Sequence, residues 1–177
     1  MSFSNKLVIT AKKPTKRTKQ ICEHLRRMLE PNVTAKLKDK NTTVKSYIDI
    51  ADAFELSHFI LVDARDIKVG IRPNGPTYIF NVVEYNPKYV RVDHEHYRDD
   101  PLITFSGSSP LKSLFSSLSS QPSTSRRNIH FHFDDDLIHI RHYAILTKDE
   151  DDIKVGFTEI GPRITVRHIK KLNGFFR

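Results

Sequence analysis

Residues 157–167, FTEIGPRITVR, decide how the rest of the chain is interpreted. Gly161 supplies a backbone conformation that other residues resist, and Pro162 sets the φ angle of the next position. From Arg163 onward polar and apolar residues alternate, which predicts a β-strand with one apolar face. Arg163 and Arg167 both fall on the polar face, so we expect one strand to present two guanidinium groups on the same side.

The same construction occurs earlier in the chain. Residues 66–70 and 152–156 both read DIKVG, and a Gly-Pro pair follows four residues later in each case, at 75–76 and 161–162. The offset is 86 residues throughout, with seven identities in eleven ungapped positions. This period is too long for a solenoid unit and indicates two half-domains of about 85 residues.

Each half is predicted to contain a strand, one or two helices and a strand meander that ends at a Gly-Pro corner. The first half covers about residues 1–86, a polar connection covers about 87–101, and the second half covers about 102–177. The first helix should begin near Thr15, and a second should carry Tyr47, Ala51 and Phe54 on its inner side. A short helix should follow Ser109. This order predicts an α/β layer architecture.

Composition predicts a soluble, intracellular globular protein. Hydrophobic residues make up 38% of the chain and charged residues 28%, which is ordinary for a folded domain. The single cysteine, Cys22, excludes an internal disulfide and fits a reducing compartment. No apolar run approaches the roughly 20 residues that a membrane-spanning helix needs, and the N-terminus lacks the apolar region of a signal peptide.

The net charge of +8 is concentrated at the two ends of the chain. Residues 1–45 contain 12 Lys and Arg but only 3 Asp and Glu, and the last fifteen residues contain five basic residues and no acid. A basic surface built from both ends indicates a polyanionic partner. Arg163 is equally compatible with a structural role, in which it would hold the Gly161-Pro162 corner to the other half of the chain. The candidate residues for binding this polyanion are Lys12, Lys13, Lys16, Arg17, Arg26, Arg27, Lys36, Lys38, Arg163, Arg167, Lys170 and Lys171.

Nothing in the sequence specifies a catalytic or cofactor site. His94 with His96, and His130 with His132, would each point two imidazoles the same way on an extended segment, but no spacing brings three or four metal ligands together. Cys22 lies beside the apolar stripe of a helix, where packing is the simpler role. We therefore expect no enzyme activity, no metal and no cofactor.

Several segments, taken as a set, resemble the Brix domain of eukaryotic ribosome-assembly factors. They include residues 25–31 (LRRMLEP), 34–38 (TAKLK), 58–61 (HFIL), 74–77 (NGPT) and 157–163 (FTEIGPR), together with an Arg-His-Tyr motif. Within that family they are most similar to the Peter Pan (suppressor-of-sterile-four) branch. The residues that match the family motifs are Gly75, Pro76, Thr77, Arg141, His142, Tyr143, Glu159, Gly161 and Pro162.

The resemblance implies a single Brix domain over residues 1–177, with two similar α/β halves. Each half would be like the anticodon-binding domain of class IIa aminoacyl-tRNA synthetases. It also implies a nuclear, nucleolar factor for the large ribosomal subunit that binds precursor rRNA and other assembly-factor proteins. Peter Pan proteins usually carry a long acidic insertion and a long basic C-terminal extension, so the match is to a shortened form. The alternatives are a protein-interaction scaffold, or a sister Brix protein of another branch, including small-subunit processing.

Overall fold

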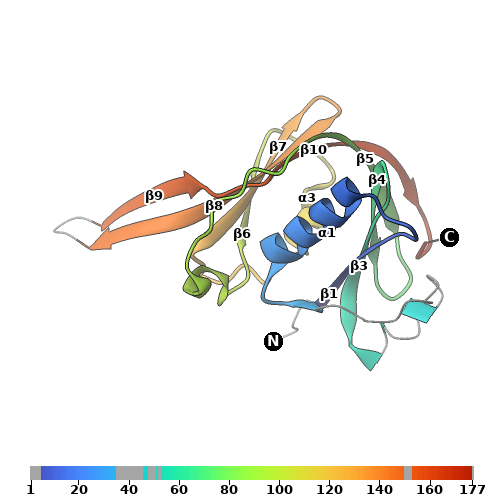
Figure 1. The fold of residues 1–177 in the computed structure, drawn as a ribbon, viewed down its shortest axis with the longest axis horizontal. Helices are drawn as coiled ribbons and strands as arrows, with labels where there is room; N and C mark the ends of the chain where they lie inside the picture. Colours follow the sequence, from blue (N-terminus) through green and yellow to red (C-terminus); the bar gives the residue numbers. More distant parts are fainter. Residues whose placement is uncertain (1–4, 35–45, 48–50, 52, 150–152, 177) are drawn as a thin grey trace.

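The computed structural model describes residues 5–34, 46–47, 51, 53–149 and 153–176. The strands form one mixed sheet, and α1 and α3 lie on one side of it (Figure 1). The elements of the first half are β1 (Asn5–Thr10), α1 (Lys16–Leu29), β2 (Val33–Thr34), β3 (Leu56–Val62), β4 (Asp66–Ile71) and β5 (Thr77–Asn86). The elements that follow are η1 (His94–Tyr97), β6 (Leu102–Ser106), α3 (Lys112–Ser116), β7 (Arg127–Asp134), β8 (Leu137–Asp149), β9 (Ile153–Glu159) and β10 (Arg163–Leu172).

The strand order confirms the predicted α/β fold with two related halves. It runs β2-β1-β3-β4-β5-β10-β8-β7-β6, with β9 paired to β8 off this path. In each half an outer strand runs parallel to the next one, β1 with β3 and β6 with β7; the short β2 is also parallel to β1, and the remaining pairs are antiparallel. The halves meet where β5 pairs with β10, so one continuous sheet crosses the whole chain.

Helix α1 forms where the sequence predicts it. The Thr15 hydroxyl accepts a hydrogen bond from the backbone N–H of Thr18, which satisfies one of the free donors of the first turn. Ile21, Leu25 and Met28 recur at helical spacing and are buried against the sheet. Pro31 lies just beyond the helix end. In the second half the helix α3 is much shorter than α1, with five residues against fourteen.

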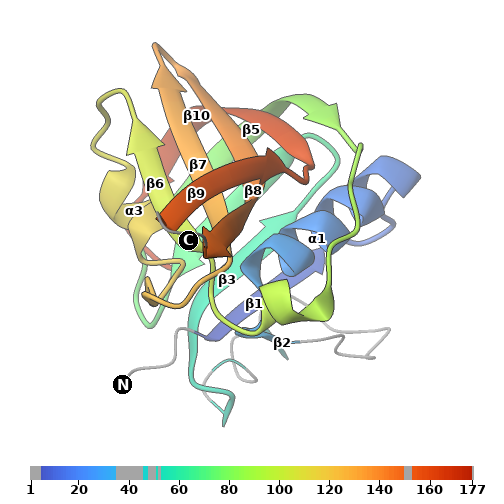
Figure 2. The same ribbon diagram turned by 90° about the vertical axis from the view of Figure 1, so that its left-hand side faces the viewer.

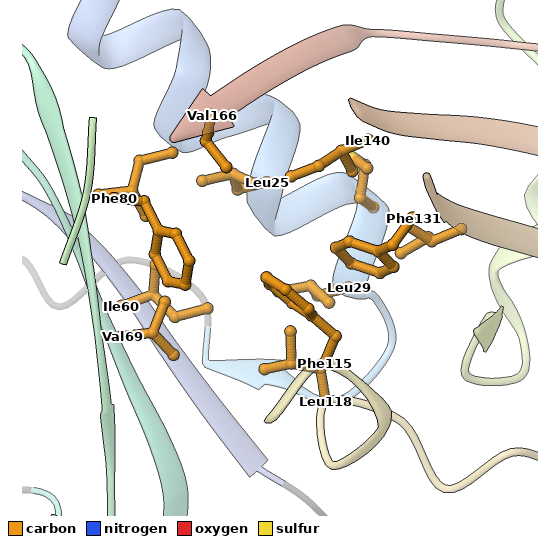
Figure 3. A pocket seen from close by; sticks show the side chains of 13 residues that line it. Leu25, Leu29, Ile60, Val69, Phe80, Phe115, Leu118, Phe131, Ile140 and Val166 are labelled. Carbon is orange, nitrogen blue, oxygen red and sulfur yellow. The ribbon is translucent and has the colours of Figure 1, made fainter. Parts of the chain in front are cut away.

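The sheet bends around the two helices, so its inner face encloses one core shared by both halves (Figure 2). Figure 3 shows the centre of this core, where Phe80 and Ile60 of the first half face Phe115 and Phe131 of the second. The rings of Phe115 and Phe131 stack at 4.2 Å. A cavity of about 50 Å³ remains there, and every side chain that lines it is apolar. Because pockets for drug-sized ligands begin near 300 Å³, this void is a packing gap at the seam between the halves.

A second, smaller apolar cluster covers the outer face of β1 and β3. Phe59 lies at its centre, and the C-terminal Phe175 and Phe176 pack edge-on against its ring. Tyr47 and Ala51 also join this cluster, as predicted for the second helix, although most of that helix falls outside the described residues. The predicted inward position of Phe54 is wrong, because 47% of Phe54 is exposed.

The 86-residue repeat does not mark equivalent strands. The first DIKVG segment forms β4, which lies between β3 and β5, and its Gly-Pro pair lies in the β4–β5 turn. The second belongs to β9, which pairs with β8 off the main path of the sheet. Both β9 and β10 run antiparallel to β8, and Gly161-Pro162 lies between them. The strand in the position of β4 is β8. A short apolar strand sequence suits any hairpin, so tertiary pairing decides which strand it becomes.

The outer parts of β8 and β9 project from the body as a two-stranded arm (Figure 1). Leu146, Val155 and Phe157 on this arm are all about half exposed or more. On the body, the outer face of β6, β7 and β8 carries polar side chains, whereas their apolar residues point inward to α1 and α3. His130 and His132 lie on this outer face while Phe131 and Phe133 fill the core, as the alternation predicted.

Candidate nucleic-acid interface

The N-terminal basic cluster, Lys12, Lys13, Lys16 and Arg17, spans the β1–α1 loop and the first turn of α1. All four side chains are exposed. The first turn contains no acidic residue, although the positive end of the helix dipole favours acids there. Four cations beside the helix N-terminus therefore create a concentrated positive potential that attracts phosphates.

Arg26 and Arg27 have different environments at the other end of α1. The Arg26 Nε donates a hydrogen bond of 2.8 Å to the carbonyl of Val8, so this half-buried side chain ties the helix to β1. The Arg27 guanidinium is exposed and lies over the ring of Tyr89, 4.5 Å from its centroid. Arg27 is thus available to a phosphate, whereas Arg26 is already used within the fold.

The two arginines of β10 are exposed, but each is paired with a carboxylate. The Arg163 guanidinium donates two hydrogen bonds of 2.6 Å to Glu159, and this pairing holds the pKa of the Glu159 carboxyl below its usual value. Arg167 Nε lies 2.5 Å from a carboxylate oxygen of Asp136. The partner of Arg163 belongs to the same half, so its pairing does not join the halves. A phosphate at either arginine must compete with an acid already bound.

The remaining lysine candidates lie at the end of β10 and after β2. Lys170 and Lys171 are exposed, and the Lys171 ammonium is 5.6 Å from the centroid of the Tyr78 ring. Lys36 and Lys38 lie outside the described residues. Among the described candidates, the N-terminal cluster follows β1, whereas Lys170 and Lys171 lie on β10, four strand positions away across the sheet.

The first family motif, Gly75-Pro76-Thr77, holds the C-terminal tail. The buried Thr77 hydroxyl donates to the carbonyl of Gly174 at 2.9 Å and accepts from the N–H of Phe176 at 2.7 Å. Gly75 has φ +96°, and a Cβ there would lie 2.5 Å from the backbone of Gly174. Only glycine combines this conformation with so close an approach. The motif therefore has a structural role.

The second motif, Gly161-Pro162, holds the connection between the halves in the same way. Gly161 has φ +72°, and a Cβ there would meet the carbonyl oxygen of Lys88 at 2.1 Å. The N–H of Val90 donates to the carbonyl of Ile160. His142 of the Arg-His-Tyr motif is buried beneath this corner, and its Nδ1 donates to the carbonyl of Gly161 at 3.0 Å. Burial and the nearby Arg127 lower the pKa of His142 to about 3, so it is neutral.

The other two residues of that motif lie on the outer face of β8. Arg141 is half-buried, and its guanidinium donates to the carbonyls of Ile140 and Ile164 at 3.0 and 3.4 Å. The bond to Ile164 ties β8 to β10. Tyr143 is half-buried opposite Asn128 of β7, at the root of the arm.

Arg127 is the most important residue that sequence reasoning missed. Its side chain is fully buried, and its guanidinium donates to five backbone carbonyls, those of Arg27, Met28, Glu30, His96 and Asp99. The guanidinium also lies 4.3 Å from the centroid of the Tyr97 ring. Burial lowers the pKa of Arg127 to about 10. Arg127 therefore joins β7, the end of α1 and the connection. Its position in the sequence, after a serine-rich loop and beside Arg126, gives no sign of this role.

A second buried polar group that sequence reasoning missed also joins the halves. Lys6 of β1 is fully buried, with its ammonium 3.8 Å from Asp100, and Asp100 also accepts hydrogen bonds from Asn32 and from the N–H of Ser120. His58 of β3 contacts the hydroxyl of Ser117 at 2.9 Å. Burial, with a smaller effect of Lys6, lowers the pKa of His58 to about 4.

Among the described residues, no group of three or more His, Cys, Asp or Glu side chains is arranged to hold a metal ion. Cys22 is buried and within 3.7 Å of the Val8 carbonyl, and burial raises the pKa of its thiol to about 11. A thiol of this kind is protonated and unreactive at neutral pH. No helix in the described ranges is long and apolar enough to cross a membrane.

The sequence matches the model of a known protein family. The sequence profile of the Brix domain matches residues 11–170, which is most of the chain. No curated protein matches the chain. The Brix-domain family is associated with ribosome biogenesis and rRNA binding. Both Gly-Pro motifs, the Arg-His-Tyr motif and the shared core apart from Val8 lie within the matched range. The chain belongs to the Brix-domain family.

Proposed function

We propose that this protein is a non-catalytic rRNA-binding assembly factor in early maturation of the large ribosomal subunit, of the Peter Pan type, acting in the nucleolus. The observation that carries the RNA-binding part is the N-terminal basic cluster. It is exposed and lies at a helix N-terminus without acids in the first turn. The branch and the subunit rest on the sequence resemblance.

The proposed phosphate-binding residues fall into two groups, those without an acidic partner among the described residues and those that form an ion pair with a carboxylate. The N-terminal cluster and Lys170 would bind phosphates directly, because their side chains are exposed. Arg163 and Arg167 would act only after releasing Glu159 and Asp136. Structured RNA is recognised largely through shape and backbone, so base-specific contacts are not needed for this mode.

We also propose that the chain acts as a single Brix domain rather than as two independent halves. The inner core contains residues from both halves, and Arg127 bonds to carbonyls of the first half and of the connection. Such a unit presents its basic surface in a fixed geometry to precursor rRNA and to other assembly-factor proteins.

The test of RNA binding is its salt dependence. The affinity for a large-subunit precursor rRNA fragment is measured between about 50 and 200 mM salt for the wild type and for the double variant Lys16→Gln/Arg17→Gln. Each lost phosphate contact should reduce the slope of log K against log salt by about 0.7 to 0.9. The control, Arg98→Gln/Lys112→Gln, removes the same charge outside the cluster and should keep the wild-type slope. Equal slopes for both double variants would contradict the assignment of the cluster.

The branch is tested by the RNA that accompanies the protein. The tagged protein is purified from its own cells at moderate salt, and the bound RNA is sequenced. Large-subunit precursor with spacer attached is the expected result. Small-subunit precursor would move the protein to another Brix branch, and no precursor rRNA at all would overturn the proposed function.

A further inference from the structure

The outer face has a hollow where the arm joins the body. Five side chains line it, Thr104 from β6, Asn128 and His130 from β7, Tyr143 from β8, and Phe157 from β9, and we call this hollow the arm-root site. It encloses about 320 Å³, at the lower end of the range for small-ligand sites. None of the candidate RNA-binding residues identified from the sequence lines it.

Phe157 is the most exposed large hydrophobic side chain in the described part of the chain, at 62%. Strand register explains why it faces the hollow. Phe157 pairs with Ile145 and Tyr143 pairs with Glu159, so the aromatic residues of β8 and β9 lie on one face of the arm. Tyr143 is also opposite Asn128, which continues this face onto the body. The fold thus places two aromatic rings beside a polar floor.

The polar floor is ordered by hydrogen bonds. The Thr104 hydroxyl lies 3.1 Å from the Asn128 amide nitrogen and 2.8 Å from His130 Nδ1. On its far side, His130 Nε2 is 2.9 Å from the Ser106 hydroxyl. The Thr104 hydroxyl accepts from the Asn128 amide nitrogen, and its single hydrogen can go to only one of two acceptors, His130 Nδ1 or Asn128 Oδ1 at 3.2 Å. The Asn128 amide oxygen has two lone pairs, so it keeps acceptor capacity for a ligand in a fixed position.

The charges around the site favour an anionic chain over an uncharged one. Arg141 pairs with His130 across the strands, and Arg163 lies exposed near the corner that follows β9. Glu159, opposite Tyr143 on this face, is ion-paired with Arg163, so these two charges offset each other and Arg141 supplies the remaining positive charge. Partial burial and His132 lower the pKa of His130, so near neutral pH its imidazole has one donor and one acceptor, which Thr104 and Ser106 engage.

We propose that the arm-root site binds an unpaired nucleobase of the RNA. Phe157 and Tyr143 supply the stacking surface, and Asn128 and Thr104 hydrogen-bond to the polar edge of the base, while His130, bonded to Thr104 and Ser106, holds Thr104 in place. Sequence-tolerant stacking on exposed aromatic rings is the usual way in which proteins hold unpaired bases. This inference rests on the proposed RNA-binding function and adds a site for single-stranded nucleotides to the phosphate contacts of the N-terminal cluster.

The test compares two RNAs with the same helix, one with a single-stranded bulge and one fully paired. Phe157→Ala should weaken binding of the bulged RNA by about 5- to 150-fold, the range for one lost base stack. It should leave the salt slope and the affinity for the paired RNA unchanged, and Phe157→Trp should restore binding. The matched control is Leu146→Ala, which removes a half-exposed apolar side chain from the opposite face of the arm and should change nothing.

The outcomes separate this inference from the proposed function. If Phe157→Ala binds the bulged RNA as the wild type does, while Lys16→Gln/Arg17→Gln still reduces the salt slope, the arm-root site is wrong and the function stands. If the wild type binds neither RNA, both fail. A nucleoside monophosphate is the second ligand tested: if it binds at Phe157 as tightly as the bulged RNA, the site takes free nucleotides and the inference is overturned.

Discussion

Replacing Arg127 by methionine should destabilise the whole domain. Methionine keeps an apolar stem of similar length but removes every hydrogen bond from the guanidinium to the five carbonyls. Three of those carbonyls, of Arg27, Met28 and Glu30, lie at the end of α1, where only the Arg27 carbonyl has a partner from the helix cap, the N–H of Glu30 at 3.4 Å. The loss therefore affects the helix end, the connection and β7 together.

The magnitude follows from the number and burial of these bonds. A hydrogen bond to a charged group contributes about 1.5 to 3 kcal/mol, but five bonds from one side chain are not additive. Removing one partner of a buried charged interaction costs about 3 to 5 kcal/mol. We expect a loss in this range, which is a large part of the roughly 5 to 15 kcal/mol that stabilises a typical domain.

Urea unfolding measures the loss. With an m-value of about 2 kcal/mol/M, the midpoint should fall by about 1.5 to 2.5 M. The control is Arg126→Met, whose exposed ion pair with Glu95 contributes less than about 1 kcal/mol. A loss below about 1 kcal/mol for Arg127→Met, or equal losses for both variants, would show that these carbonyls do not depend on Arg127.

Three further predictions concern the core, a corner and acid stability. Phe115→Ala should cost about 3 to 5 kcal/mol in urea unfolding, because its ring fills the seam between the halves; a cost below 1 kcal/mol would refute the shared core. Gly161→Ala should cost more than about 1 to 2 kcal/mol, since φ is +72° and the added methyl meets a carbonyl, whereas Gly156→Ala, with open space around it, should be nearly neutral. His58 has a pKa lowered from 6.5 to about 4 by burial, so its unfolded form binds the proton first and stability should fall as pH drops from about 6.5 to 4; His58→Gln should flatten this part of the stability–pH curve, and an unchanged curve would contradict the assignment.

Much of the local structure follows from the sequence because it depends on short-range rules. The Thr15 cap and the stripe of Ile21, Leu25 and Met28 predict α1, and strict alternation predicts that His130 and His132 face outward. Capping and periodicity act within a few residues, so they can be recognised without knowledge of the fold. The concentration of basic residues at residues 12–17 is equally visible, and the structure places these residues on the surface.

Only the tertiary structure decided which distant segments meet. The DIKVG repeat suggested equivalent strands, but pairing placed one copy between two strands and the other on the arm. The motif glycines depend on segments about 70 to 100 residues away, Lys88 for Gly161 and Gly174 for Gly75. The neighbouring arginines 126 and 127 look alike in sequence, yet one is exposed and the other is the buried partner of five carbonyls. Burial and pairing of this kind are properties of long-range contacts, whose partners no local pattern records.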